Sequence, residues 1–509
     1  MSIVISRSFR AFIGILFAGS IVLLLLFLFS RLHGGPVDRT GNSAVTITLT
    51  SSGFEPKNIY ISRGTKVTFR SVAGKQFWPA SNLHPFHTIY PAFDPKRPLE
   101  PDETWSFVFD KDGDWNFHDH INPIIVGSII VVPPGEKGSE KYDVLAPCDQ
   151  SAYSGRQACW EEYLSFAMDR HGLDAALDEL HTLYQTYPEF AVNCHNYAHD
   201  LGLLAYIRYG DSTQLDYKTV YCGQGFYHGF MEGLLAKHNG DIASASAYCL
   251  HVTAAFGDGQ YAILGPQCMH GIGHGYMEYL LSTRGDLIAH PLQLVSLAMT
   301  GCAQLPDNDT MFRCASGAFA VLKDWINLQG LTKQYAAFFS AENPYAICRS
   351  VTDEWAMRAC AWEMSKEAYI LNKNDPAATF RVVRSAGADW EPQYVSSMIM
   401  STAFFIGELG VSQPNARLIA ACQTIPDGIL QDTCIQGVVQ GLMFNGDPEN
   451  EKARASSFCR SGGLRRTQGE ACAERVVNYM SNSSGASMKS TACTVFSDLL
   501  HNDTVCASQ

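Results

Sequence analysis

The segments CGQGFYHGFMEG (Cys222–Gly233) and CMHGIGHGYMEY (Cys268–Tyr279) are two copies of one pattern, and they decide how most of the chain is interpreted. CASGAFAVLKDW begins at Cys314 and CAWEMSKEAYIL at Cys360, so the step is 46 residues each time. This period is typical of helical pairs that stack into a solenoid. CIQGVVQGLMFN at Cys434 is a further copy, and the 74-residue gap before it has room for a copy without cysteines.

The cysteines follow the same period. All 16 lie between Cys148 and Cys506, and many form pairs with ten to twelve residues between the two members. This spacing favours one disulfide in each repeat, closing the turn between two helices, in an oxidising compartment. Cysteine–metal ligation is the alternative. The candidate disulfides join Cys148 to Cys159, Cys302 to Cys314, Cys348 to Cys360, Cys422 to Cys434, Cys459 to Cys472, and Cys493 to Cys506.

The chain before the repeats divides into three parts. Residues 11–30 are apolar and uncharged, and about 20 such residues suffice to cross a bilayer. We therefore interpret residues 1–33 as a cytoplasmic tip and an uncleaved transmembrane anchor. Residues 44–132 alternate in hydrophobicity between Gly, Pro and Asp turns, which predicts an all-β sandwich. We interpret residues 133–147 as a linker. We interpret residues 148–509 as a Cys-rich, all-α helical-repeat domain.

Composition limits the partners. The net charge of −13 argues against nucleic-acid binding and against docking on anionic lipid through a basic patch. The apolar segment predicts contact with a membrane, in a single pass that leaves the main part periplasmic or extracellular. The helical repeats offer a surface for an envelope protein partner.

Within residues 44–132, the motifs GFEPKNIYISRGTKVTFR, HPFHTIY and WNFHDHINPIIVG occur in an order that resembles a cupredoxin. Cupredoxins are the Greek-key sandwiches of plastocyanin-like proteins and multicopper oxidases. The resemblance implies a copper site at one end of the sandwich. However, Asp119, Asn122 and Ile125 stand where a blue-copper domain has its cysteine, histidine and methionine. Because the thiolate gives such sites their electron-transfer properties, a blue electron carrier is not expected.

Four histidines remain on the metal motifs. HPFH supplies His84 and His87, and HDH supplies His118 and His120, in elements that resemble those through which multicopper oxidases bind copper. On a strand, residues 118 and 120 point to the same face. Imidazoles suit copper, zinc and other divalent ions, and the resemblance favours copper. The alternative is a degenerate domain whose histidines only form hydrogen bonds.

The first helical repeats carry a second histidine constellation. Its members are spaced four residues apart, which places each pair on one helical face, and adjacent repeats can aim them into one space. They are His195 with His199, His228 with Glu232, and His270 with His274 and Glu278. These residue types suit one or two metal ions or an acid–base pocket. Packed histidines at glycine-rich helix contacts are the alternative. The helical part resembles no family that we recognise.

The sequence thus predicts a multidomain protein with a transmembrane helix, a Greek-key cupredoxin-like sandwich and a disulfide-stapled helical-repeat domain. The favoured function is that of a membrane-anchored, extracytoplasmic metal-binding protein with a non-blue centre, copper being favoured over zinc. A non-blue copper oxidoreductase and a metal-free envelope interaction or scaffold protein are the alternatives. No catalytic nucleophile or cofactor motif is identified, so an enzyme would be a metal-dependent oxidoreductase.

Overall fold

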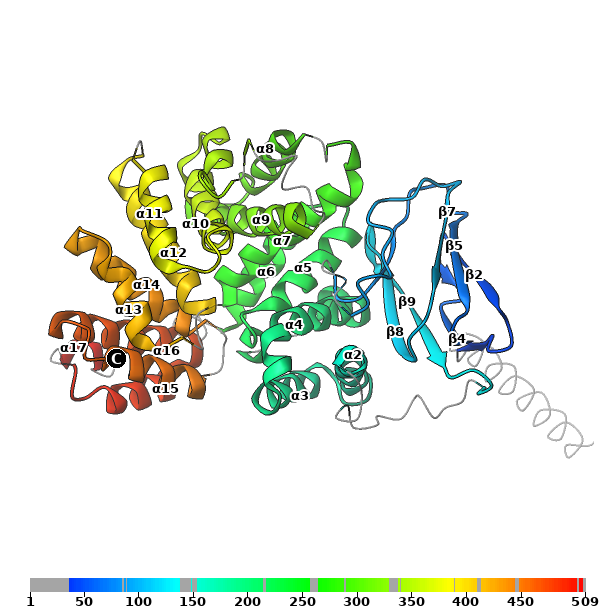
Figure 1. Ribbon diagram of the computed structural model, residues 1–509, viewed down its shortest axis with the longest axis horizontal. Helices are drawn as coiled ribbons and strands as arrows, with labels where there is room; N and C mark the ends of the chain where they lie inside the picture. Colours follow the sequence, from blue (N-terminus) through cyan, green and yellow to red (C-terminus); the bar gives the residue numbers. More distant parts are fainter. Residues whose placement is uncertain are drawn as a thin grey trace, which may run out of the picture.

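The structure is a computed structural model in which the N-terminal part forms sheets and the remainder is helical (Figure 1). The residues it describes are 36–84, 87, 89–137, 148, 153–213, 217–256, 264–287, 290–328, 337–338, 340–388, 390–409, 413–444, 448–500 and 503–506.

Nine strands build the sheet part within the described residues. They are β1 (Val37–Asp38), β2 (Ala44–Thr50), β3 (Gly53–Glu55), β4 (Asn58–Ser62), β5 (Lys66–Ser71), β6 (Pro79–Ser81), β7 (Thr104–Val108), β8 (Gly113–Asp119) and β9 (Asn122–Val132). One sheet has the order β1-β4-β9-β8-β6 and the other β3-β2-β5-β7. Both sheets mix parallel and antiparallel pairs. Alternating apolar residues such as Ile47, Phe69 and Phe117 fill the core between them.

The end of β8 positions two of the predicted ligands. β8 pairs with β9 in antiparallel register, and this register shifts between His118 and Asp119. An irregularity of this kind bends the strand and re-aims the side chains beside it. The chain then turns through His120, whose backbone N–H donates to the carbonyl of Trp78. The histidines of the HDH motif therefore lie at the rim of the sandwich.

Paired helices form the rest of the chain. They are α2 (Tyr153–His171), α3 (Leu173–Thr186), α4 (Pro188–Tyr209), α5 (Gly225–Lys237), α6 (Ile242–Phe256), α7 (Leu264–Thr283), α8 (Pro291–Cys302), α9 (Asn308–Leu328), α10 (Glu354–Leu371), α11 (Pro376–Ala386), α12 (Pro392–Leu409), α13 (Asn415–Gln423), α14 (Gly428–Leu442), α15 (Pro448–Cys459), α16 (Arg466–Val495) and α17 (Asp503–Cys506). Short 3-10 turns lie at Gly210–Ser212, Tyr217–Val220, Gly285–Leu287 and Ala346–Ser350.

Successive inner helices of the array pack against one another from α4 through α5, α7, α9, α10, α12 and α14 to α16. The array extends away from the sandwich: α2 packs against β8 and α5 against β9, whereas α13 to α17 lie at the far end (Figure 1). The helix pair α11–α12 occupies the gap before Cys434 and contains no cysteine. Glycines bring the first inner helices close together, because a Cβ at Gly229 would lie 1.9 Å from the carbonyl oxygen of His199.

Disulfides staple the array. The structure contains eight of them and no free cysteine among the described residues. Six join the pairs named from the spacing. The other two, Cys194–Cys222 and Cys249–Cys268, have larger sequence separations of 28 and 19 and therefore depart from the regular interval. Most of them tie the end of one helix to the next inner helix, as the repeat pattern predicts.

The predicted fold class is wrong in its membrane-spanning helix, and the predicted single-pass membrane localisation is wrong with it. In the described part of the chain, every helix falls short of the length and apolar character that a bilayer crossing needs. Residues 11–30, on which that interpretation rested, lie outside the described residues, as does most of the linker at 133–147.

Candidate metal centre

The two predicted histidine constellations meet at one place, where the sandwich rests on the first helices of the array. Asn82, in the loop after β6, donates to Glu161 Oε1 of α2 at 2.6 Å and to Asp200 Oδ1 of α4 at 3.3 Å. Asn116 of β8 donates to the same Glu161 oxygen at 3.2 Å. These contacts hold the loop that carries His84 against the helices.

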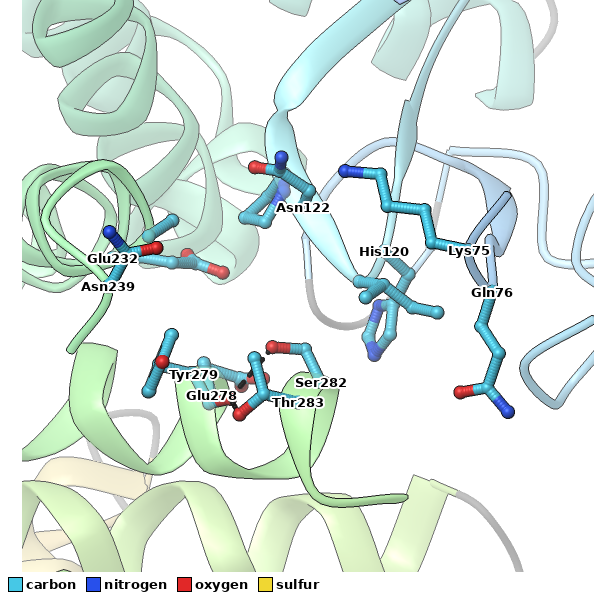
Figure 2. A pocket seen from close by; sticks show the side chains of 13 residues that line it. Lys75, Gln76, His120, Asn122, Glu232, Asn239, Glu278, Tyr279, Ser282 and Thr283 are labelled. Atoms are coloured by element: carbon cyan, nitrogen blue, oxygen red, sulfur yellow. Dashed lines mark hydrogen bonds between the residues drawn. The ribbon is translucent and has the colours of Figure 1, made fainter. Parts of the chain in front are cut away.

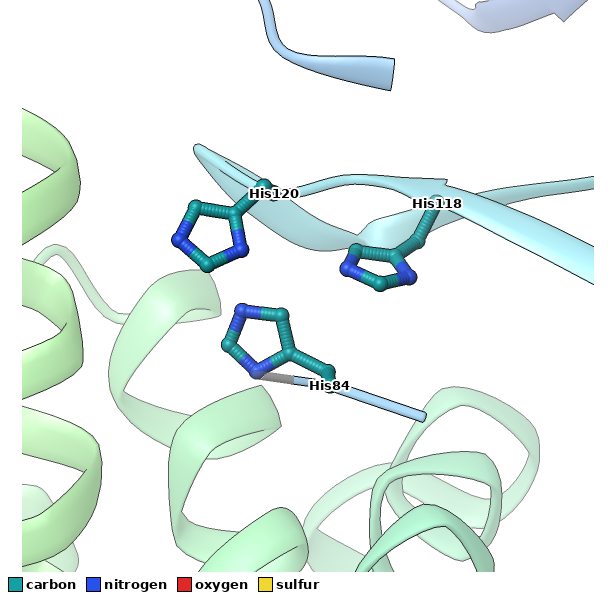
Figure 3. A group of neighbouring side chains, drawn as sticks. All are labelled: His84, His118 and His120. Carbon is teal, nitrogen blue, oxygen red and sulfur yellow. The ribbon is translucent and has the colours of Figure 1, made fainter. Parts of the chain in front are cut away.

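Three histidines of the sheet part converge at this junction. The ring centroid of His84 lies 4.8 Å from that of His118 and 4.6 Å from that of His120. Each offers a nitrogen, and the three nitrogens lie within 4.8 Å of one another. Figure 3 shows His84 facing the strand end that carries the other two rings. All three side chains are buried. The trio therefore has the donor set and spacing of a metal site.

The environment of His118 fixes which of its nitrogens is free. Its Nδ1 lies 2.9 Å from Asn82 Oδ1, and the Asn82 amide nitrogen is committed to the two carboxylates. Because an amide oxygen only accepts, His118 Nδ1 must be the protonated atom. His118 Nε2 is then a lone-pair donor, and it is buried without a hydrogen-bond partner among the described residues. A hydrogen bond that orients the second ring nitrogen is typical of metal-ligating histidines.

His87 supports the trio from the sandwich side. Its Nδ1 lies 2.5 Å from Asp94 Oδ2, and its Nε2 lies 3.0 Å from His120 Nδ1. Burial raises the pKa of Asp94, but hydrogen bonds from His87 and Lys96 outweigh this and leave that pKa below its usual value. Asp94 is therefore a carboxylate, and it accepts a hydrogen bond from the N–H at His87 Nδ1. Trp78 donates to the other Asp94 oxygen at 2.8 Å and fixes it in place.

His84 also faces the helical array. Its Nδ1 lies 2.5 Å from Glu232 Oε1 of α5, yet these two atoms are not aligned as a hydrogen bond. Glu278 of α7 adds a carboxylate oxygen, and the three ligand atoms again lie within 4.8 Å of one another. His199 Nε2 of α4 lies 3.5 Å from the second oxygen of Glu232. A second three-ligand group thus shares His84 with the first.

The burial of these groups sets their charges. Burial lowers the pKa of His84, His118 and His120 well below the usual value, and the neighbouring histidines add to the shift. The rings are therefore neutral at pH 7 and can donate lone pairs to a cation. Burial also raises the pKa of Glu232 and Glu278 well above the usual value. A cation between these groups would relieve that desolvation cost.

The other predicted helical histidines extend the cluster without forming a ligand set. Ring centroids lie 5.4 Å apart for His199 and His274, 4.3 Å for His228 and His274, 5.0 Å for His228 and His270, and 4.9 Å for His195 and His228. Among the described residues, neither three-ligand group includes any of the five helical histidines, which are His195, His199, His228, His270 and His274. His87 is likewise in neither group. Burial lowers the pKa of His195 to about 4 and of His270 to about 3, so both are neutral as well.

Asp119, which stands at the cysteine position of the cupredoxin pattern, points away from the trio. Its Oδ1 accepts the backbone N–H of Trp78 at 2.8 Å and that of Ile121 at 3.3 Å. Burial raises its pKa to about 6. Asp119 therefore supports the turn after β8, and it is absent from both three-ligand groups that the described residues form.

Sequence reasoning missed the residues that join the two constellations. Asn82, Glu161 and Asp200 stand in no metal motif, and no periodicity marks them. Burial and the nearby Glu232 raise the pKa of Asp200 to about 7. Only their tertiary contacts reveal that they orient His118 and dock the sandwich.

Comparison of this chain with protein-family models, with curated proteins and with solved structures finds no match.

Proposed function

We propose that this protein binds a metal ion, copper being favoured, through His84, His118 and His120. The observation that carries the proposal is the convergence of three buried, neutral imidazoles, in which nitrogens of His84 and His118 have no well-aligned hydrogen bond in the described part of the chain. Unpaired buried nitrogens destabilise a fold by about 1–3 kcal/mol each, so three of them at one point favour a ligand that accepts their lone pairs.

The donor set supports a non-blue centre. Three imidazole nitrogens without a thiolate suit Cu(II) and Zn(II), and they lack the bond on which blue-copper electron transfer depends. We propose that residues 44–132 are cupredoxin-like, which the two mixed sheets and the rim position of the histidines support. A bound ion would supply Lewis acidity, or redox chemistry in the case of copper. The chain's own contribution would be the orientation of His118 by Asn82 and the burial of the site.

The experiment is metal loading of the oxidised protein, residues 34–509, followed by measurement of bound copper and zinc. We expect tight binding in the wild type and less bound metal in the double variant His118→Ala, His120→Ala, which removes two of the three ligands. A matched control is His171→Ala with His251→Ala, because both of these histidines are exposed on the helical part. No bound metal after loading, or equal binding in the two double variants, would refute the proposal.

A further inference from the structure

We infer that the centre holds two metal ions, the second bound by His84 Nδ1, Glu232 and Glu278, so that the His84 ring bridges two unlike sites. This inference rests on the proposed function, because the first ion is the one held by the histidine trio. The two groups are distinct in their donors: one offers three nitrogens, and the other offers one nitrogen and two carboxylate oxygens.

The position of the His84 ring supports the bridge. Nδ1 is the atom beside Glu232. In Figure 3 one ring nitrogen faces the other two histidines, and the second nitrogen lies at the opposite edge of the ring. A contact with the His120 backbone raises the pKa of His84 slightly against the effect of burial, but neither nitrogen has a well-aligned hydrogen bond to a described residue, although the side chain is only 2% exposed. A histidine that merely packs or hydrogen-bonds would satisfy at least one of its nitrogens.

The carboxylates supply the second independent observation. Both oxygens of Glu232 and Oε1 of Glu278 are buried without hydrogen bonds in the described chain. The ion-pair contacts of Glu232 there are the neutral rings of His84 and His199, so no Lys or Arg in the described residues neutralises it. One oxygen of each carboxylate lies within 4.8 Å of the other. Two buried carboxylates this close together are costly unless a cation lies between them.

A pocket gives this second site access to solvent. It has a volume of about 350 Å³, and Glu232, Glu278 and His120 contribute to its wall together with Lys75 and Asn122. Figure 2 shows the helical residues on one side of it and His120 on the other. An ion can therefore enter from the pocket, and the proton that His84 loses when both of its nitrogens bind metal can leave to water by the same route. The N–H bond breaks and a second nitrogen–metal bond forms, which makes binding release a proton.

The unlike donors predict unlike ions. Nitrogen-only ligands favour copper, whereas carboxylates add to the harder end of the range and favour zinc or manganese. We therefore expect one copper in the trio and one zinc in the carboxylate site when both metals are supplied. When copper alone is supplied in excess, two copper ions share the His84 ring and their unpaired electrons couple magnetically.

The test uses the full oxidised chain loaded with copper, with metal stoichiometry and electron paramagnetic resonance as readouts. We expect two copper ions per chain in the wild type, with a spin signal well below two equivalents. The double variant Glu232→Gln, Glu278→Gln should bind one copper and give one full mononuclear signal. Glu363→Gln is the matched control, because Glu363 is equally buried but bonds to Ser316 elsewhere in the array. It should retain two coupled ions.

Each outcome decides a separate point. One copper in both the wild type and the double variant would overturn the second site and leave the proposed function standing. Two copper ions with two full, uncoupled signals would overturn the bridge. No copper in the wild type would refute the proposed function itself. If the double variant does not fold, zinc added to one-copper wild type replaces it: zinc binding that leaves a mononuclear copper signal supports the second site, and failure to bind zinc overturns it.

Discussion

The side chains of Asn82 and His118, 36 residues apart in the chain, share a hydrogen bond of 2.9 Å at the point where the sandwich meets the helices. The same Asn82 donates to Glu161 of α2. One amide thus orients a ligand ring and joins the two halves of the protein, so a single substitution tests both roles.

Replacement of Asn82 by alanine should weaken metal binding by about 10–100-fold, the usual cost of losing an orienting partner of a ligating histidine. The metal-free protein should also lose about 1–3 kcal/mol of unfolding free energy, because Glu161 and Asp200 lose a donor. Titration calorimetry and denaturant unfolding measure the two effects. Asn415→Ala, which removes a surface contact with Ser457, is the control and should change neither.

Substitution of Gly229 by alanine should push α4 and α5 apart, because the added Cβ would lie 1.9 Å from the His199 carbonyl oxygen. We expect a loss of about 1–3 kcal/mol or more in unfolding free energy, with weaker metal binding because Glu232 lies on the same helix. Thermal unfolding and metal titration are the measurements. At Gly428 a Cβ meets nothing within 4 Å, so Gly428→Ala should be neutral or slightly stabilising. Equal effects at the two glycines would contradict the packing argument.

Removal of a disulfide far from the centre should lower stability without changing metal affinity, whereas removal of one beside the centre should lower both. Replacing Cys459 and Cys472 by serine should lower the unfolding free energy by about 2–4 kcal/mol and leave metal affinity unchanged. Replacing Cys194 and Cys222 should lower both, because Cys222 supplies the carbonyl that accepts from His195 Nδ1 at 3.1 Å and the bond ties α4 to the segment before α5. Unchanged metal affinity in the second pair would show that the disulfide does not help to shape the centre.

The metal-free protein should lose stability as the pH falls from about 6.5 towards 4. Burial lowers the pKa of His195 to about 4 and of His270 to about 3, whereas an unfolded histidine titrates near 6.5. Between these values the unfolded chain binds protons that the folded chain does not, so protonation favours unfolding and stability returns as the pH rises. Asp200, with its pKa raised to about 7, acts in the opposite direction.

Variants isolate the histidine contribution to this pH dependence. Melting temperatures measured from pH 7.5 to 4.5 should fall less steeply in His195→Gln, His270→Gln than in the wild type. His251→Gln changes an exposed histidine on α6 and should keep the wild-type slope. Identical slopes in all three proteins would contradict the assignment.

Much of the fold can be read from the sequence because its signals are local. The 46-residue period and the Cys302–Cys314 type of spacing each arise within one helical pair, and the structure contains those disulfides. The alternation of residues 44–132 likewise indicates strands directly. The regular spacing does not predict the disulfides Cys194–Cys222 and Cys249–Cys268, because longer segments separate the two cysteines of each pair. The membrane-spanning interpretation is wrong, because in the described part of the chain every helix is too short or too polar to cross a bilayer.

The joint centre could not be predicted, for a physical reason. His84 and Glu232 approach through the docking of one domain on another, and such docking leaves no periodicity in either segment. The individual ligands were visible because metal motifs and helical i,i+4 pairs are local patterns. The contact between the two groups of ligands depends on hydrogen bonds among Asn82, Asn116 and Glu161. The spacing of these polar residues in the sequence does not predict that contact.

The contribution of ligands from both sides of the domain junction has a mechanical consequence. An ion held by His84 of one domain and Glu232 of the other would tie the two domains together, and by thermodynamic linkage its binding free energy would add to the work required to separate them. Each tenfold gain in affinity adds about 1.4 kcal/mol to that work. Conversely, a tension or a competing surface that draws the sandwich away from the helices would expel the ion.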